Sequence, residues 1–121
     1  MPNKKTLVIG ASENEDRYSN MAIKLLIKYG HDVVAIGNRK GTVDNVNIET
    51  EKKDLDDIDT VTLYLNPKLQ VQYYEYILSL KPRRIIFNPG TENLDLKQLA
   101  EAKGIITEDA CTLVILRLGK Y

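Results

Sequence analysis

The sequence predicts an α/β fold, with a doubly wound five-stranded parallel sheet and helices on both of its faces. Short apolar runs without polar alternation recur along the chain, which is the pattern of strands covered on both sides. Segments with helical spacing of apolar residues separate these runs, and such alternation is typical of parallel sheets. We expect residues 1–121 to form one domain, because 43% hydrophobic content can supply a single core without a disulfide or a structural metal.

The first strand and the turn after it organise this prediction. Leu7 to Ile9 form an unbroken apolar run, and Gly10 then allows a tight turn that Ala11 and Ser12 keep free of bulk. A helix is expected soon afterwards, with an apolar face formed by Met21, Ala22, Leu25, Leu26 and Tyr29. Its N-terminus points back toward Gly10, where unpaired N–H groups and a partial positive charge favour a phosphate.

The middle of the chain supplies two further strands. Residues 33–36 are the second strand, which stops at the basic, turn-rich segment 37–41. Residues 42–48 can supply a short edge strand, whereas residues 49–59 are mostly charged. The third strand covers residues 60–65. Asn66-Pro67 closes it, with the asparagine as a helix cap and the proline at the first helical position.

Two more strands and three helices complete the prediction. The helix after Pro67 has one apolar face, formed by Leu69, Tyr73, Tyr76, Ile77 and Leu80. Residues 84–87 are the fourth strand, and residues 88–93 lead into a helix that contains Leu96, Leu99 and Ala100. A fifth strand begins at Ile105, and a final helix is expected from Ala110 to about Gly119, capped by Asp109.

In a Rossmann-like sheet, ligands bind at the carboxyl ends of the strands, across the point where the strand order reverses. We expect the third strand to lie beside the first one at this point. The loops at this edge are Gly10-Ala11-Ser12, Gly37 to Gly41, Asn66-Pro67 and Asn88-Pro89-Gly90. They consist largely of glycine, proline and small polar residues, so a ligand can come close to the backbone.

Charge and composition limit the kinds of partner. Seventeen basic and seventeen acidic residues cancel, so no overall basic field attracts nucleic acid or an anionic membrane, and a phosphate ligand needs a local cluster. The single cysteine excludes an internal disulfide and favours a reducing compartment. No apolar run is long enough for a signal-peptide core or a membrane span. We therefore expect a cytoplasmic protein. A homodimer is compatible with the sequence.

The turn after the first strand lacks the fingerprint of an NAD site. Gly10 has no companion glycines in a G-x-G-x-x-G pattern, and no carboxylate follows the second strand to bind ribose hydroxyls. Arg39 and Lys40 stand there instead, where they would meet a phosphate on the adenosine ribose, as in NADP or coenzyme A (CoA). The alternative interpretation is that these two residues form a solvated loop.

The motif G-A-S-x-x-x-x-R, from Gly10 to Arg17, resembles the small bacterial CoA-binding proteins, which are similar to the N-terminal CoA-binding domain of the succinyl-CoA synthetase alpha subunit. The resemblance covers nearly the whole chain. It implies that residues 10–12 contact the pyrophosphate, that Arg17 pairs with phosphate, and that residues 38–40 lie at the adenosine 3′-phosphate. The sequence departs from the family where Gly37-Asn38-Arg39 replaces the usual Val-Asn-Pro, and where Asn88-Pro89-Gly90 replaces a common Gln-x-Gly.

Together, the edge loops and the resemblance define a set of candidate ligand contacts. The set is Gly10, Ala11, Ser12, Arg17, Tyr18, Gly37, Asn38, Arg39, Lys40, Asn66, Pro67, Asn88, Pro89 and Gly90. We expect no catalytic residue and no metal ligand among them.

Other reactive side chains have simpler interpretations. His31, the only histidine, is expected in a surface loop at the amino ends of the strands, opposite the ligand edge. Cys111, near the start of the last helix, could reach the ligand edge but is read as a buried structural cysteine. Glu92 is a lone carboxylate, which is a weak basis for acid or base catalysis.

These observations favour a CoA-binding domain that binds CoA or an acyl-CoA without catalysis. Two alternatives remain open at this stage. The first is a small NADP-dependent oxidoreductase, which is disfavoured because the sequence shows no substrate domain or proton-relay pair. The second is a nucleotide-sensing or ligand-free interaction module that shares only the fold.

Overall fold

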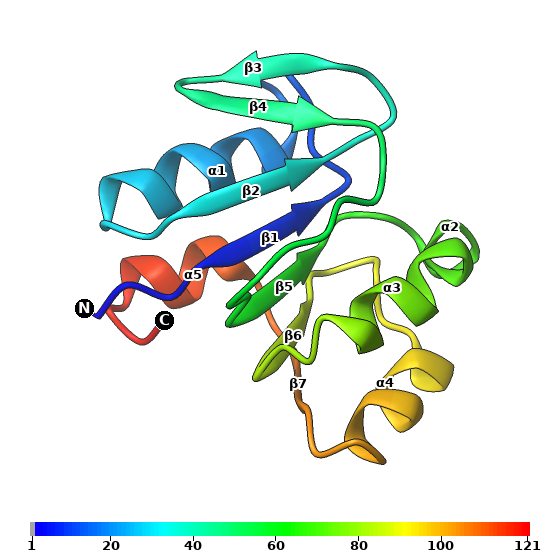
Figure 1. Cartoon of the computed structure of the whole chain (residues 1–121). Helices are drawn as coiled ribbons and strands as arrows, with labels where there is room; N and C mark the ends of the chain where they lie inside the picture. The colour runs from blue at the N-terminus through cyan, green and yellow to red at the C-terminus, as the bar shows by residue number, and fades with distance from the viewer. Residues whose placement is uncertain (1) are drawn as a thin grey trace.

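The computed structural model describes residues 2–121, whose seven strands form one sheet (Figure 1). Its spatial order is β3-β4-β2-β1-β5-β6-β7. The strands are β1 (Thr6–Ile9), β2 (Val33–Ile36), β3 (Gly41–Val43), β4 (Val46–Glu49), β5 (Thr60–Leu63), β6 (Arg84–Phe87) and β7 (Ile106–Asp109). The strand after Thr60 lies beside β1, as predicted, so the strand order reverses between β1 and β5.

The helices are α1 (Tyr18–Lys28), α2 (Pro67–Gln70), the 3-10 turn η1 (Val71–Tyr73), α3 (Tyr74–Ser79), α4 (Leu94–Glu101) and α5 (Thr112–Arg117). Helices α1 and α5 pack on one face of the sheet, and α3 and α4 pack on the other (Figure 1). Successive side chains of β1 point to opposite faces of the sheet, so this strand contributes to both cores. Leu7 and Ile9 pack in the core under α3 and α4, and Val8 packs in the core under α1 and α5.

The prediction of five parallel strands was wrong, because residues 41–49 form a hairpin of two strands. Strand β3 pairs antiparallel with β4, and β4 pairs parallel with β2, so the sheet is mixed. The hairpin turns at Asp44 and Asn45, and Asp44 adopts a positive φ of 51° that aspartate tolerates better than most residues. Asp-Asn between two valines was the signal for this turn. The sequence analysis predicts at most a single edge strand here; the two strands of the hairpin are short and carry polar residues.

Two helix predictions also needed correction. The sequence places Met21 in the apolar face of α1, but this residue is 37% exposed; Ala22 and Leu26 are buried as predicted, and Ile23, which the prediction omits, is buried with them. The final helix begins at Thr112, with Cys111 as its N-cap. Asp109 was expected to cap that helix, but it ends β7 and pairs with Lys97.

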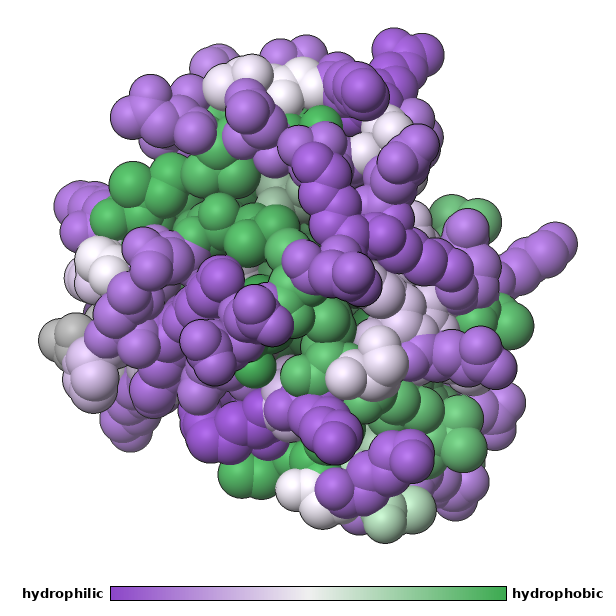
Figure 2. All heavy atoms as spheres, in the orientation of Figure 1, coloured by the Kyte–Doolittle hydropathy of each residue, from purple (hydrophilic) through white to green (hydrophobic). Residues whose placement is uncertain are grey.

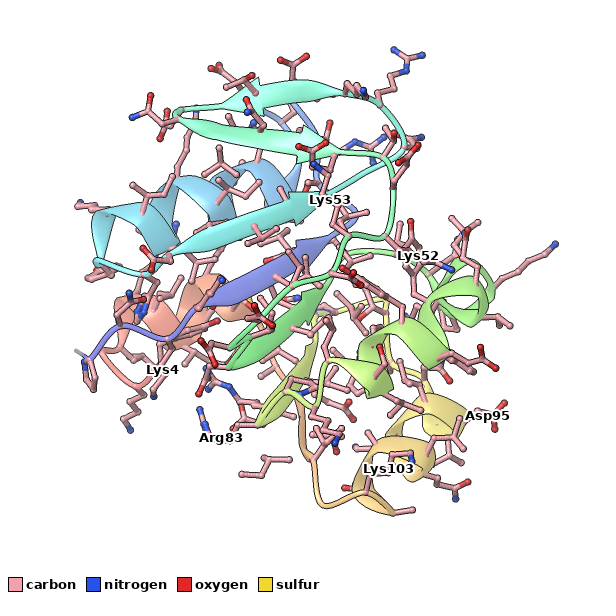
Figure 3. All side chains as sticks on the ribbon, in the orientation of Figure 1. Lys4, Lys52, Lys53, Arg83, Asp95 and Lys103 are labelled. Atoms are coloured by element: carbon pink, nitrogen blue, oxygen red, sulfur yellow. The ribbon has the colours of Figure 1, made fainter. Side chains whose placement is uncertain are left out.

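His31 lies at the amino edge of the sheet, as predicted, but it is not a surface residue. It is 3% exposed, and its ring packs against the ring of Tyr121 at 4.8 Å between centroids. Lys4 and Arg83 mark this edge in Figure 3. The His31 Nδ1 atom accepts a hydrogen bond of 2.9 Å from the Lys4 backbone N–H. Burial lowers the pKa of His31, and the positive charge of Lys4 lowers it further.

We expect the fold to lose stability as the pH falls through His31's ordinary pKa of about 6.5. The unfolded chain then binds a proton that the folded chain resists, since a protonated Nδ1 could not accept from the Lys4 N–H. Stability contributed by neutral His31 is therefore complete above pH 6.5 and decreases below it. Urea unfolding between pH 7.5 and 5 measures this, with His31→Asn as a control that keeps an acceptor and does not titrate. An identical pH dependence in both proteins would contradict the prediction.

Asp59, at the same edge, does not interfere with that measurement. Burial alone would raise its pKa, but hydrogen bonds from Arg83 and Thr60 lower it below its ordinary value of 3.8, outside the tested window.

Candidate functional site

A cleft of about 550 Å³ opens where β1 and β5 separate at their carboxyl ends. Its lining residues lie in the β1 turn and the start of α1 (10–19), the turn after β2 (37–38), the segment after β5 (64–73) and the segment after β6 (89–91). Nine predicted contacts are among its lining residues, which are Gly10, Ala11, Ser12, Arg17, Tyr18, Gly37, Asn38, Asn66 and Pro89. The topology therefore brings together residues from four separate stretches of the sequence.

Two glycines allow the backbones around the cleft to come close together. Gly10 has a φ of +95°, and a Cβ atom there would lie 2.9 Å from the carbonyl carbon of Tyr64. A Cβ atom at Gly37 would overlap the carbonyl oxygen of Ala11. The amides of Gly10 and Ala11 both donate to the Ile36 carbonyl, at 2.9 and 3.0 Å. The β1 turn is thus fixed against β2 and β5 without intervening side chains.

The N-terminus of α1 opens into the cleft. Arg17 is the N-cap residue of α1, and its side chain makes no capping hydrogen bond. The Arg17 side chain therefore does not occupy the first N–H groups of the helix. Tyr18 and Ser19, the first two helical residues, line the cleft. Asn20 is buried and donates through Nδ2 to the Ser12 carbonyl at 3.0 Å, which ties the turn to the helix. This arrangement can accept an anionic group.

Arg39 and Lys40 lie outside the main cleft, in an adjoining hollow of about 170 Å³. The two spaces share Ala11, Ser12 and Asn38 as lining residues. Within residues 2–121, neither basic side chain forms an ion pair, and both residues are exposed. Arg17 is likewise exposed and forms no ion pair in this part of the chain.

Glu13 contributes the carboxylate of this hollow, and that carboxylate already accepts a hydrogen bond from within the protein. Its Oε2 accepts a hydrogen bond of 2.8 Å from the Thr42 N–H, and its side chain covers Gly41. The hairpin that the sequence prediction missed therefore holds this carboxylate at the hollow.

The other end of the cleft is more apolar. Leu65 and Leu69 lie there with Tyr73, Pro89 and Thr91. Hydrophobic residues also reach the surface over α2 (Figure 2), where Leu69 is 47% exposed. The Lys52 side chain lies over the ring of Tyr73, with its Nζ atom 5.3 Å from the centre of the ring (Figure 3).

Seven lining residues were missed by the sequence prediction. They are Ser19, Tyr64, Leu65, Leu69, Gln72, Tyr73 and Thr91. Tyr64 and Leu65 directly follow β5, so their position after a strand was a signal, but the sequence prediction extends that strand to residue 65. The others come from helices or loops whose placement depends on the tertiary fold.

Some predicted contacts lie away from the lining of the cleft. Asn88 is buried, donates to the Thr62 hydroxyl at 2.7 Å and the Leu63 carbonyl at 2.9 Å, and accepts from the Thr112 N–H at 2.9 Å. Its hydrogen-bonding atoms therefore hold β5, β6 and α5 together. Pro67 and Gly90 are exposed beside the cleft but do not line it.

The main cleft has few groups suited to proton transfer near neutral pH. Its titratable side chains are Arg17, Tyr18, Tyr64 and Tyr73, and burial raises the pKa of Tyr64 well above its ordinary value. His31 is at the opposite edge, and Cys111 is partly buried outside the lining of either space. Glu92 accepts a hydrogen bond from the Gly90 N–H at 2.8 Å.

Residues 2–121 form neither a membrane-spanning helix nor a cluster of metal ligands. No helix in this range is long and apolar enough to cross a membrane. Histidine, cysteine and carboxylate side chains of the same range form no group of three that could hold a metal ion.

The fold and the site define a Rossmann-like α/β protein with a cleft at the switch point of its sheet. The model of a family described as CoA binding domain matches residues 4–117, and the chain belongs to that family. A comparison with curated proteins found no match.

Solved structures share this architecture. A crystal structure described as that of an uncharacterized protein has 44% identity and a TM-score of 0.97, with 100% of both chains covered. A hypothetical protein from Pyrococcus horikoshii OT3 has 27% identity and a TM-score of 0.86, covering 97% of this chain and 84% of its own. Prb, described as PH1109 protein redesigned for binding, has 22% identity and a TM-score of 0.87, covering 99% of this chain and 87% of its own. At this identity, the similarity shows a shared fold alone.

Proposed function

We propose that this protein binds CoA or an acyl-CoA, without catalysing a reaction, in the cleft between β1 and β5. The observation that carries the proposal is the continuity of the cleft's open helix N-terminus with a hollow that holds Arg39 and Lys40. CoA has a pyrophosphate and, a ribose away, a 3′-phosphate, so it needs two anion sites near each other. Membership of the CoA-binding family supports the same ligand.

The features of the cleft suggest an orientation for CoA. The pyrophosphate would lie at Gly10 to Ser12 and the N-terminus of α1, with Arg17 beside it. The adenosine 3′-phosphate would meet Arg39 and Lys40. The pantetheine arm would then extend toward the more apolar end at Leu69 and Tyr73, where an acyl group would also point.

Binding without catalysis is supported by the side chains of the main cleft. None of its lining residues is a histidine, a cysteine, a lysine or a carboxylate, which are common groups for acid, base or nucleophilic chemistry. The single cysteine of the chain and a CoA ligand both accord with the cytoplasmic location we propose.

CoA at one hundred times its dissociation constant should stabilise the protein by ~2.7 kcal/mol, because only the folded state has the cleft. Thermal unfolding with CoA, acetyl-CoA, NADP and no ligand measures this. A shift with CoA and acetyl-CoA but not NADP is expected. A shift with NADP alone would favour the oxidoreductase, and no shift with any of these ligands would favour an interaction module.

A further inference from the structure

The Gln70 side chain connects two walls of the cleft. It is 0% exposed, and its Nε2 atom donates to the Leu65 carbonyl and to the Thr91 carbonyl, each at 2.8 Å. Leu65 follows β5 and Thr91 follows β6, and both residues line the cleft. A single amide therefore joins the segments beyond the ends of two neighbouring strands.

The rest of the amide is also occupied. Its Oε1 atom accepts from Asn93 Nδ2 at 2.9 Å, and the same Nδ2 atom donates to the Tyr74 hydroxyl at 2.7 Å. Asn93 Oδ1 accepts from the Leu96 N–H at the start of α4. The network thus fixes Gln70 in one orientation, with both of its N–H bonds directed at the two carbonyls.

We infer that Gln70 is a positioning residue, which sets the separation of the Leu65 and Thr91 walls at the apolar end of the cleft. This inference rests on the proposed function, since that end is where the pantetheine arm of CoA would lie. Strand pairing ends at Leu63 and Phe87, so it does not itself fix the segments beyond. Gln70 acts on the ligand through these two walls, because it does not line the cleft.

The chemistry of the amide makes its replacement informative. Methionine has a similar shape but no N–H, so Gln70→Met leaves two carbonyls without their donor. An ionised glutamate would instead place a negative oxygen against both carbonyls. Gln70→Glu should therefore disturb the walls more at pH 8 than at pH 6, where a larger fraction of this buried carboxyl is protonated.

Calorimetry with CoA and with adenosine 3′,5′-bisphosphate, which lacks the pantetheine arm, tests the ligand effect. We expect Gln70→Met to weaken CoA at least about tenfold while changing the affinity for the bisphosphate less than about twofold. Gln98→Met, on the exposed side of α4, is the matched control and should change neither. Gln70→Glu should bind CoA more weakly at pH 8 than at pH 6, relative to the wild type. Equal losses for both ligands, or no loss for CoA, would overturn the inference.

Hydrogen exchange on the ligand-free proteins separates this inference from the proposed function. Amides of residues 64–66, 88 and 90–92 should exchange faster in Gln70→Met, or in Gln70→Glu at pH 8 if the methionine variant does not fold, while β1 and β2 keep their protection. Unchanged exchange in these segments would overturn the role of Gln70, whatever CoA does. If the wild type does not bind CoA, the proposed function fails, and the exchange comparison still decides whether Gln70 fixes the walls.

Discussion

Replacing Gly10 with alanine should destabilise the fold by about 2–5 kcal/mol and remove CoA binding. Two physical costs add at this position. The φ of +95° is unfavourable for a residue with a side chain, at about 1–2 kcal/mol. The new Cβ atom would also lie 2.9 Å from the Tyr64 carbonyl carbon, and such overpacking costs about 1–3 kcal/mol. Because the neighbour is backbone, it can move only by disturbing the end of β5.

Gly30→Ala is the matched control for this substitution. Gly30 has a similar φ of +86°, but no heavy atom lies within 4 Å of the position of its Cβ, and it is at the opposite edge of the sheet. It should therefore show the conformational cost alone and leave CoA affinity unchanged. Urea unfolding gives the free energies, and calorimetry under conditions where both variants are folded gives the affinities. Equal destabilisation by the two substitutions would mean that the contact with Tyr64 is easily relieved.

CoA should bind more tightly than dephospho-CoA, because Arg39 and Lys40 face the position proposed for the 3′-phosphate. A charge-assisted hydrogen bond contributes about 1.5–3 kcal/mol, so the loss of one or two would cost roughly one to two orders of magnitude in affinity. Both side chains are exposed and screened by salt, so we expect the lower end, about tenfold, with a larger difference at low ionic strength.

Two variants separate the two phosphate positions. Arg39→Ala should weaken CoA but hardly change dephospho-CoA, which has no group for Arg39 to bind. Arg17→Ala should weaken both ligands alike, because the pyrophosphate is common to them. Calorimetry on the three proteins decides this, and equal wild-type affinity for CoA and dephospho-CoA would make Arg39 and Lys40 a solvated turn.

Most of the parallel part of the sheet could be predicted from the sequence. Apolar runs such as Leu7 to Ile9 identify buried strands wherever they fall, and their alternation with helices fixes the direction of pairing. The turn at Gly10 and the position of α1 follow from the same local pattern. By contrast, the β3-β4 hairpin has short strands with polar residues, so periodicity could not separate it from a loop.

Tertiary contacts decided what the sequence could not. His31 follows a helix and precedes a strand, which is a surface position in most sheets, but Tyr121 and the Lys4 N–H enclose it from distant parts of the chain. Gln70 and Asn88 are polar residues beside predicted ligand loops, yet their amides face inward to bind carbonyls and hydroxyls. Leu69 and Tyr73 were assigned to a core face; Tyr73 does pack against the core under α3 and α4, but Leu69 is 47% exposed, and both residues line the cleft.

The most direct test of this account is a titration of the ¹⁵N-labelled protein with CoA, followed by backbone amide chemical shifts. We predict saturable shifts at the β1 turn (10–12), the start of α1 (17–19), the turn after β2 (37–40) and the residues after β5 (64–66), with little change at the amino edge around His31. Saturable shifts centred on the amino edge, or none at CoA concentrations up to the millimolar range, would contradict binding in the cleft.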